Sequence, residues 1–220
     1  MEDKKKIVQK KFDMLADGYD SGKRWGKQFF LNFAHKCILK VINPSYNSKI
    51  IDIGCGTGEL ALKILGLIPL GMIVGTDISY RMILEANKKI PKDKKIRFIV
   101  GDAEALEFKS DTFDYVVSTT SFHHYTSPEK VLKETFRTLK SGGMLIISDF
   151  SSDFFTMKIL GKTLFKLDKS HTKCYSGKEM RTMLLDAGFI KATSKKTHIK
   201  VSRFRIPFLS THILTTGFKP

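Results

Sequence analysis

Cysteine is scarce in this chain, and that scarcity limits the chemistry the sequence can support. Only three of the 220 residues are cysteines, Cys37, Cys55 and Cys174, and no two of them form a CxxC pair. An odd number of widely spaced cysteines is typical of reduced thiols rather than of a disulfide framework or a zinc site. The cysteine pattern therefore predicts no bound metal ion.

Long apolar runs are missing as well. The uncharged stretch Ile64–Thr76 is interrupted by Pro69 and Gly71 and is well short of the roughly 20 residues that a membrane-spanning helix needs. Residues 1–13 carry charges but lack the apolar segment of a secretory signal. The sequence thus predicts a cytoplasmic protein with no spanning helix, and it leaves peripheral contact with a membrane open.

Acidic residues are rare toward both ends of the chain. Residues 1–50 hold 11 basic and 5 acidic side chains, residues 51–150 hold 13 of each, and residues 151–220 hold 14 and 4, for a net charge of +16. Basic flanks favour an anionic partner, nucleic acid or an acidic membrane surface. A lysine-rich solvated surface is the simpler explanation, because few aromatic residues alternate with the lysines as they do on a nucleic-acid-binding face.

The composition, with 42% hydrophobic residues and only 6 prolines, is that of a globular protein with room for a full core. Short β-branched runs alternate with helical patterns, which is typical of βαβ units and a parallel sheet. We expect strands over residues 49–53, 72–77, 96–101, 113–118 and 144–149, and helices over 57–67, 79–90 and 127–139. Beyond residue 150 we expect helices over 154–167 and 176–187 and strands over 189–198 and 203–216.

A glycine-rich turn, Asp52–Gly58 (DIGCGTG), ends the first expected strand and opens a helix. Glycines let the backbone approach a ligand closely, and a helix N-terminus adds free amides. The dinucleotide-binding pattern GxGxxG would place glycine or alanine where this chain has Glu59, and a carboxylate there would oppose a pyrophosphate. The turn therefore predicts a cofactor site without a pyrophosphate, and it disfavours a nicotinamide-dependent oxidoreductase.

Three aspartates, Asp52, Asp77 and Asp102, fall at the carboxyl ends of successive expected strands. Open α/β sheets bind their ligands at this edge. An acidic side chain at the end of the second strand can accept two hydrogen bonds from ribose hydroxyls, and one at the end of the third can accept from an exocyclic amine. Taken together, the three positions predict a nucleoside-containing ligand.

Several segments resemble the class I S-adenosylmethionine-dependent methyltransferases, in particular the group that includes enzymes of ubiquinone and menaquinone biosynthesis. The matching segments are IDIGCGTG at 51–58, TDIS at 76–79, GDAEALEF at 101–108, FDYVVSTTSFHH at 113–124 and LKSGGMLIISDF at 139–150. FDMLADGYD at 12–20 is similar to the opening segment of the same group, whereas 151–220 matches only in its expected pattern of elements.

The resemblance implies an α/β fold: a Rossmann-like, doubly wound, seven-stranded sheet, mostly parallel with an antiparallel last strand and helices on both faces. It implies one methyltransferase domain over residues 1–220. The parts of that domain would be an N-terminal helical lid at 1–48, a cofactor-binding core at 49–150, a substrate-cap insertion at 151–175, and a C-terminal helix with strands at 176–220.

The resemblance also implies that S-adenosyl-L-methionine is the cofactor, with S-adenosyl-L-homocysteine as its product. The implied cofactor-binding residues are Tyr19, Asp52, Gly54, Cys55, Gly56, Gly58, Asp77, Ile78, Asp102, Ala103 and Ser118. Among them Asp52 and the glycine-turn amides would hold the methionine part, Asp77 the ribose, and Asp102 with Ala103 the adenine edge. Ser118 would approach the sulfonium, and Tyr19 would close over the cofactor.

The acceptor is expected to be a small molecule of aromatic, lipid-like or anionic character. This follows from the basic flanks and from phenylalanines near the expected cap, Phe150, Phe154, Phe155 and Phe165, which core packing explains equally well. His123 is a candidate general base if the acceptor needs deprotonation. An RNA methyltransferase, or a non-catalytic cofactor-binding module with its basic flanks on nucleic acid or membrane, remains an alternative. The oligomeric state is not predicted.

Overall fold

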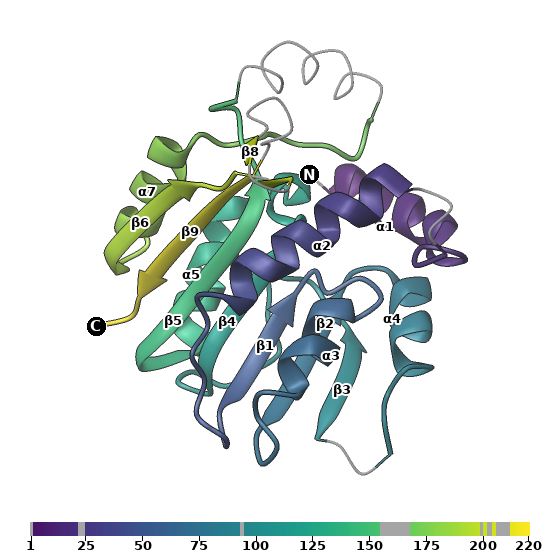
Figure 1. The fold of residues 1–220 in the computed structure, drawn as a ribbon, viewed down its shortest axis with the longest axis horizontal. Helices are drawn as coiled ribbons and strands as arrows, with labels where there is room; N and C mark the ends of the chain where they lie inside the picture. Colours follow the sequence, from purple (N-terminus) through teal and green to yellow (C-terminus); the bar gives the residue numbers. More distant parts are fainter. Residues whose placement is uncertain are drawn as a thin grey trace.

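Seven strands form one mixed sheet in the order β3-β2-β1-β4-β5-β9-β6 (Figure 1). The computed structural model describes residues 2–21, 25–92, 95–154, 168–198, 200–201, 204–205 and 212–220. The strands of the sheet are β1 (Lys49–Ile53), β2 (Met72–Asp77), β3 (Ile96–Val100), β4 (Phe113–Thr119), β5 (Leu139–Phe150), β6 (Ile190–Lys196) and β9 (His212–Phe218).

The pairing directions confirm the predicted fold class. Strands β1 to β5 pair in parallel, whereas β9 runs antiparallel to both of its neighbours, β5 and β6. In the register Ile53 lies beside Thr76, and Asp77 lies beside Val100. The loops that leave β1, β2 and β3 therefore emerge side by side at one edge of the sheet, as the three strand-end aspartates require.

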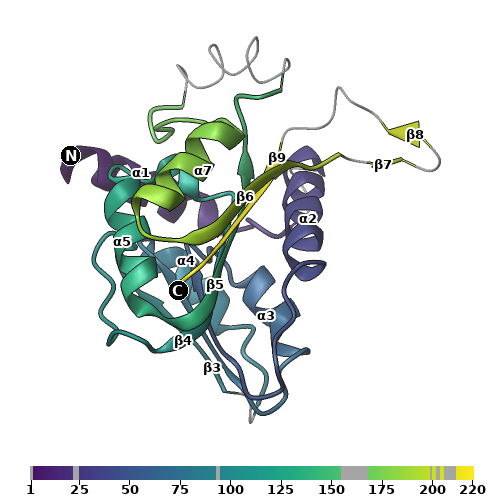
Figure 2. The same cartoon turned by 90° about the vertical axis from the view of Figure 1, so that its left-hand side faces the viewer.

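Helices cover both faces of the sheet. They are α1 (Glu2–Ala16), α2 (Trp25–Leu39), α3 (Glu59–Leu65), α4 (Tyr80–Asn87), α5 (Pro128–Thr138) and α7 (Gly177–Asp186), with a short 3₁₀ turn, η1 (Phe122–His124). One core cluster joins α2, α3 and α4 to the sheet, and a second joins α5 and α7 to the other face. Figure 2 shows α2 and α3 on one side of the sheet and α5 and α7 on the other.

Local capping explains where several helices begin. The Ser79 hydroxyl accepts a hydrogen bond from the Met82 amide and so starts α4, and Pro128 occupies the first turn of α5. Ser176 and Glu179 form a reciprocal capping box at the start of α7. These are the helices whose starts agree best with the sequence pattern, because the capping side chain can be found in the sequence itself.

Some expected boundaries differ from the structure. Helix α3 is shorter than 57–67 because Gly58, in a left-handed conformation, still belongs to the turn. Strand β5 begins at Leu139 rather than 144, because Leu139 already pairs with Phe113 of β4. The expected strand 203–216 is wrong as one unit: β8 (Phe204–Arg205) pairs with β7 (Lys200–Val201), and β9 begins at His212. Nearly all of the expected helix 154–167, residues 155–167, lies outside the described residues.

The helices of the described part of the chain include none that is both long enough and apolar enough to cross a membrane.

Candidate functional site

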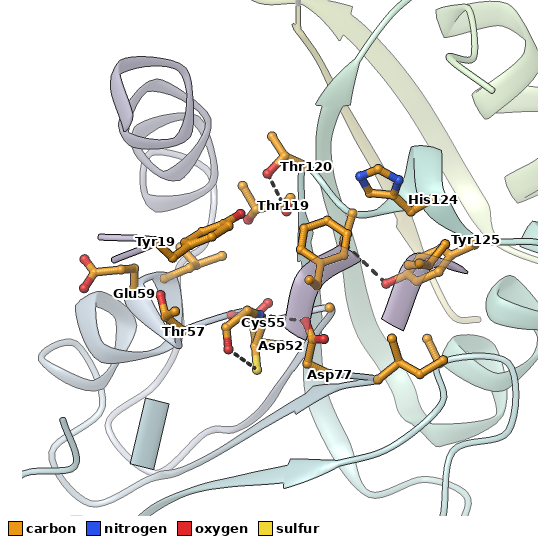
Figure 3. A pocket seen from close by; sticks show the side chains of 18 of the residues that line it. Tyr19, Asp52, Cys55, Thr57, Glu59, Asp77, Thr119, Thr120, His124 and Tyr125 are labelled. Atoms are coloured by element: carbon orange, nitrogen blue, oxygen red, sulfur yellow. Dashed lines mark hydrogen bonds between the residues drawn. The ribbon is translucent and has the colours of Figure 1, made fainter. Parts of the chain in front are cut away.

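A pocket lies at the carboxyl edge of the sheet, where the N-terminal helices meet the loops after β1, β2, β3 and β4. The described residues that line it are Lys5, Val8, Phe12, Tyr19, Asp20, Gln28, Leu31, His35, Asp52, Gly54, Cys55, Gly56, Thr57, Glu59, Leu60, Asp77, Ile78, Gly101, Asp102, Ala103, Glu104, Thr119, Thr120, Ser121, His124, Tyr125 and Thr126. Figure 3 shows Asp52, Cys55 and Asp77 on one side of it and Thr120 and His124 on the other.

The three glycines of the turn have different structural roles. Gly54, Gly56 and Gly58 all have positive φ angles, of 68°, 53° and 79°, which L side chains rarely adopt. A Cβ atom on Gly58 would lie 2.4 Å from the Phe98 ring, and one on Gly54 would lie 2.5 Å from the Ser121 Cβ. A Cβ on Gly56 would meet nothing within 4 Å. Gly54 and Gly58 are therefore needed for packing, whereas Gly56 leaves open space beside the pocket.

Asp52 ends β1 with its side chain almost completely buried, at 1% exposure. Its Oδ2 atom has no hydrogen-bond partner, although a buried carboxylate oxygen normally has one. Burial and the nearby Asp77 carboxylate raise the pKa of Asp52 well above its ordinary value. This carboxylate lies in the pocket wall and is suited to a ligand that carries a positive charge or hydrogen-bond donors.

Asp77 ends β2 and is tied to the glycine turn. Its two carboxylate oxygens accept hydrogen bonds from the amides of Gly56 (2.9 Å) and Ser79 (2.9 Å). Burial raises the pKa of Asp77, and these amide hydrogen bonds partly oppose that rise. Each carboxylate oxygen can accept more than one hydrogen bond, so Asp77 still has acceptor capacity toward the pocket.

At the end of β3, two carboxylates share one lysine of α1. The Lys5 ammonium lies 2.6 Å from Asp102 Oδ2 and 2.7 Å from Glu104 Oε2. Glu104 Oε1 also accepts hydrogen bonds from the Thr126 hydroxyl and the Ser127 amide. Burial alone would raise the pKa of Glu104, but the bonds from Lys5 and Thr126 more than offset it and hold that pKa below its ordinary value. These contacts dock α1 against the pocket.

The segment after α1 also reaches the pocket. Tyr19 lies in the turn that follows α1 rather than within a helix, and it lines the pocket. Next to it, the Asp20 carboxylate accepts a hydrogen bond from the Thr57 hydroxyl of the glycine turn at 2.9 Å. Asp13, in the last turn of α1, accepts one from the Ser79 hydroxyl at 2.6 Å. The N-terminal segment is thus bonded to the loops after β1 and β2.

The segment after β4 presents neighbouring side chains in different directions. Ser118 is fully buried and does not line the pocket; its hydroxyl bonds to that of Ser121, 2.8 Å away. Thr119 does line it, because successive strand side chains point to opposite faces. Thr120 follows with a positive φ of 49°, a strained conformation for a threonine, and it also lines the pocket.

The two histidines of η1 also diverge. In a 3₁₀ turn consecutive side chains point about 120° apart. His123 turns toward the end of β5, where its Nδ1 lies 2.6 Å from Asp149 Oδ1, and it does not line the pocket. His124 does line the pocket, and its Nδ1 lies 3.0 Å from the Ser170 carbonyl oxygen. Burial holds the pKa of His124 well below its ordinary value, so this imidazole is neutral at pH 7.

The chain is similar in sequence to known proteins. A family model described as a methyltransferase domain matches residues 51–147. The mitochondrial 2-methoxy-6-polyprenyl-1,4-benzoquinol methylase of Caenorhabditis elegans is 31% identical over 150 residues, which are 66% of this chain and 50% of that protein. The demethylmenaquinone methyltransferase of Staphylococcus aureus (strain JH9) is 27% identical over 206 residues, which are 83% of this chain and 82% of that protein.

Residues 51–147 match a methyltransferase domain, and the chain is similar to S-adenosylmethionine-dependent methyltransferases. It spans about half the length of the nematode relative, 50%. A chain in the solved complex of the Haloferax volcanii Trm112 methyltransferase activator shares its fold, with a TM-score of 0.82, 21% identity and 97% of each chain covered. The resemblance that the motifs carried is thereby confirmed.

The pocket fits S-adenosylmethionine. The unpartnered Asp52 Oδ2 matches the ammonium of the methionine part, and the open space beside Gly56 leaves room for the ligand against the backbone. Cys55 also lines the pocket, and burial raises the pKa of its thiol well above the ordinary value, so the thiol stays neutral. No pyrophosphate is present in this cofactor, which removes the conflict with Glu59.

Most of the cofactor-binding residues predicted from the sequence line one pocket. Those that do are Tyr19, Asp52, Gly54, Cys55, Gly56, Asp77, Ile78, Asp102 and Ala103. The lining does not include Gly58, Ser118 or His123: the first packs on Phe98, the second bonds behind Ser121, and the third faces Asp149. Sequence reasoning missed Lys5, Glu104, Thr120 and His124. Three of them lie in segments that carry the resemblance, Glu104 in 101–108 and Thr120 and His124 in 113–124, whereas Lys5 lies outside those segments.

Proposed function

We propose that this protein transfers a methyl group from S-adenosylmethionine to a small-molecule acceptor. The observation that carries the proposal is the buried Asp52 Oδ2 atom, which has no hydrogen-bond partner among the described residues and lies in the wall of the pocket. A buried carboxylate without a partner costs stability. A cationic ligand that donates a hydrogen bond to this oxygen would remove that cost.

The residues of the pocket bind and orient the cofactor. Asp52 accepts hydrogen bonds from the methionine ammonium, and Asp77 accepts them from the ribose hydroxyls. At the adenine edge Asp102 accepts a hydrogen bond and the Ala103 amide donates one. When bound, S-adenosylmethionine supplies a methyl group on a sulfonium and is left as S-adenosylhomocysteine once the acceptor has taken the methyl. The protein contributes mainly by holding the acceptor in line and excluding water.

The N-terminal segment acts as the lid over this site. Lys5 bonds to Asp102 and Glu104, and Lys11 bonds to Asp168 and Ser170, so that α1 connects the cofactor loops to the chain beyond β5. This supports the predicted division into a lid at 1–48 and a cap at 151–175. Of the phenylalanines predicted for the cap, Phe150 and Phe154 are described, whereas Phe155 and Phe165 lie outside the described residues.

We propose an aromatic or lipid-like acceptor. Val8, Phe12 and Leu31 give the pocket apolar wall on its N-terminal side, and the two curated relatives compared above are named for quinone substrates. A general base is optional in this chemistry. The role of His123 as base stays a prediction, and a direct contact with an acceptor in the pocket would fall to His124 instead, because His123 does not line it.

Ligand-dependent thermal unfolding tests the cofactor. A ligand at about 100 times its dissociation constant stabilises by roughly 2.7 kcal/mol, which raises the midpoint by about 5–10 °C at this chain length. We expect that rise with S-adenosylmethionine and S-adenosylhomocysteine and none with NAD. No shift with either adenosyl compound would contradict the proposal.

Transfer of a labelled methyl group tests the acceptor class. Purified protein is incubated with methyl-labelled S-adenosylmethionine and either a reduced, demethylated quinone or total RNA. Label in the quinol supports the small-molecule proposal, and label in RNA instead would support the nucleic-acid alternative. Cofactor binding with no transfer to any acceptor tried is what the non-catalytic module predicts.

A further inference from the structure

Three histidines come together behind the pocket. His123 and His124 belong to η1, and His171 comes from the chain beyond β5. One ring nitrogen of each lies within 4.8 Å of those of the other two. The ring centroid of His123 lies 4.0 Å from that of His124 and 5.1 Å from that of His171. All three side chains are buried or nearly so, with exposures of 7%, 9% and 9%.

Two of these rings already have the outer hydrogen bonds that metal-binding histidines use. His123 Nδ1 lies 2.6 Å from the Asp149 carboxylate, and His124 Nδ1 lies 3.0 Å from the Ser170 carbonyl. A histidine that binds a metal through one nitrogen nearly always donates from the other to a carboxylate or a backbone carbonyl. With Nδ1 so engaged, Nε2 is the nitrogen that His123 and His124 can offer to a ligand.

The segment that carries His171 is fixed to the other two histidines. The Thr172 amide donates to the His123 carbonyl at 2.8 Å, and the Thr172 hydroxyl donates to the His124 carbonyl at 3.3 Å. The His171 amide donates to the Asp168 carbonyl at 3.0 Å. Hydrogen bonds from Thr172 to the carbonyls of both His123 and His124 therefore hold the segment of His171 beside η1.

We propose that His123, His124 and His171 bind a divalent transition metal ion, with Zn²⁺ as the ion that suits them best. Three imidazole nitrogens with an open fourth position are a known ligand set for zinc, which prefers tetrahedral coordination with nitrogen distances of about 2.0–2.1 Å. His124 also lines the pocket, so the ion would lie next to the space where an acceptor enters.

The electrostatics of the cluster agree with a metal site. The Asp149 carboxylate lies against the cluster, with its Oδ1 2.6 Å from His123 Nδ1. The Asp149 carboxylate thus supplies a negative charge beside the cluster. Two lysines, Lys4 and Lys11, also act on its rings, and Lys11 is paired with Asp168.

This inference goes beyond the proposed methyl transfer and does not depend on it. It also replaces the expectation drawn from the cysteines, which gave no sign of a site built from histidines 47 residues apart in sequence. Metal bound at Nε2 would prevent His123 from acting as a general base. The metal site and the base role are thus competing assignments for the same side chain.

Zinc titration of the full-length protein, freed of metal with a chelator, tests the proposal. We expect one Zn²⁺ per chain, measured by calorimetry and by competition with a chromophoric chelator. Replacing an outer partner costs about 10–100-fold in metal affinity, so Asp149→Asn should weaken binding by that amount, and His171→Ala, which removes a ligand, by more. The matched control is His198→Ala, at an exposed histidine outside the cluster, which should leave the affinity unchanged.

Cobalt spectroscopy of the wild-type protein guards against variants that fail to fold. Co²⁺ in place of Zn²⁺ should give the visible bands of a four-coordinate site without a thiolate charge-transfer band, because the ligands are imidazoles rather than Cys55 or Cys174. The proposal is overturned if the wild-type protein takes up no zinc at micromolar concentration, if the cobalt spectrum shows thiolate or six-coordinate ligation, or if folded His171→Ala binds zinc as tightly as His198→Ala does.

Discussion

Two regions at the pocket are built in different ways. The glycine-turn wall, defined by Asp52, Gly54–Gly58, Asp77 and Asp102, comes from the ends of successive parallel strands. The histidine wall, defined by His123, His124 and His171, reaches the pocket lining through His124 and joins a 3₁₀ turn after β4 to a segment beyond β5. The first wall follows from the connectivity of the sheet, whereas the second exists only because two distant segments pack together.

The walls also hold buried titratable groups of opposite kind. Burial raises the pKa of Asp52 and Asp77 and lowers that of His124 and His171. In both cases the charged form is disfavoured because it has lost water. The comparison teaches that each wall is poised for a different partner: the carboxylates for a cationic or hydrogen-bond-donating ligand, the neutral imidazoles for a Lewis acid.

The largest effect is expected when a packing glycine of the first wall is replaced. Gly58→Ala would put a Cβ 2.4 Å from the Phe98 ring in a left-handed backbone. Overpacking and the left-handed conformation together cost about 2–5 kcal/mol. We expect a fall of at least about 5 °C in the unfolding midpoint, measured by calorimetry.

The matched variant is Gly56→Ala, whose Cβ meets nothing in the protein. It should lose only the conformational part, about 1–2 kcal/mol, but it should weaken S-adenosylhomocysteine binding because the new methyl enters the ligand's space. Equal stability losses for the two variants, or normal binding by Gly56→Ala, would show that the two glycines do not divide their roles in this way.

A smaller but more specific effect is expected at Asp52. Asp52→Asn keeps the shape of the side chain and removes its charge, so the hydrogen bond to a ligand ammonium loses its charge assistance. Such bonds contribute about 1.5–3 kcal/mol, which corresponds to roughly 10–100-fold weaker binding of S-adenosylhomocysteine in calorimetry. The ligand-free variant should also unfold at a higher temperature, because a buried carboxylate with an unpartnered oxygen has been neutralised.

Asp114→Asn is the control for this variant, since Asp114 is a partly exposed carboxylate at the start of β4 and does not line the pocket. It should leave the ligand affinity unchanged. It should also not raise the unfolding temperature, as Asp52→Asn is expected to do. If Asp52→Asn bound the ligand as tightly as the wild type does, the negative charge of Asp52 would not be what recognises the ligand ammonium.

The last effect appears only as a change with pH and concerns His35, a histidine that lies on the glycine-turn side. Its Nδ1 lies 3.1 Å from the Lys63 ammonium, and burial with this cation lowers its pKa from 6.5 to about 3. The unfolded chain therefore binds the proton first, and the stability that neutral His35 contributes is fully present above about pH 6.5 and is lost as the pH falls toward 3.

His35→Gln should flatten this acid sensitivity by up to about 1.4 kcal/mol per pH unit. Urea unfolding of the metal-free protein between pH 7 and pH 4 measures the slope, and His198→Gln, at an exposed position, is the control. An unchanged slope in His35→Gln would place the acid sensitivity in the histidine wall instead.

Sequence patterns predicted the first wall well because every signal there is local. A glycine turn at the end of a strand fixes its own backbone, and Asp77 and Asp102 are positioned by the register of parallel neighbours. The segment after β4 gives no such local signal. Ser118 and His123 were predicted there, whereas their neighbours Thr119 and His124 line the pocket, because one residue along a strand or a 3₁₀ turn reverses or rotates the direction of a side chain.

By itself, the sequence determined the fold class, the positions of the parallel strands along the chain and the acidic edge at their ends, since hydrophobic periodicity, glycine turns and helix caps act over a few residues. Only the tertiary structure decided which side chains meet across long separations: Lys5 with Asp102, and His171 with His123. Such meetings depend on how helices and loops pack on the sheet, and no local pattern encodes that packing.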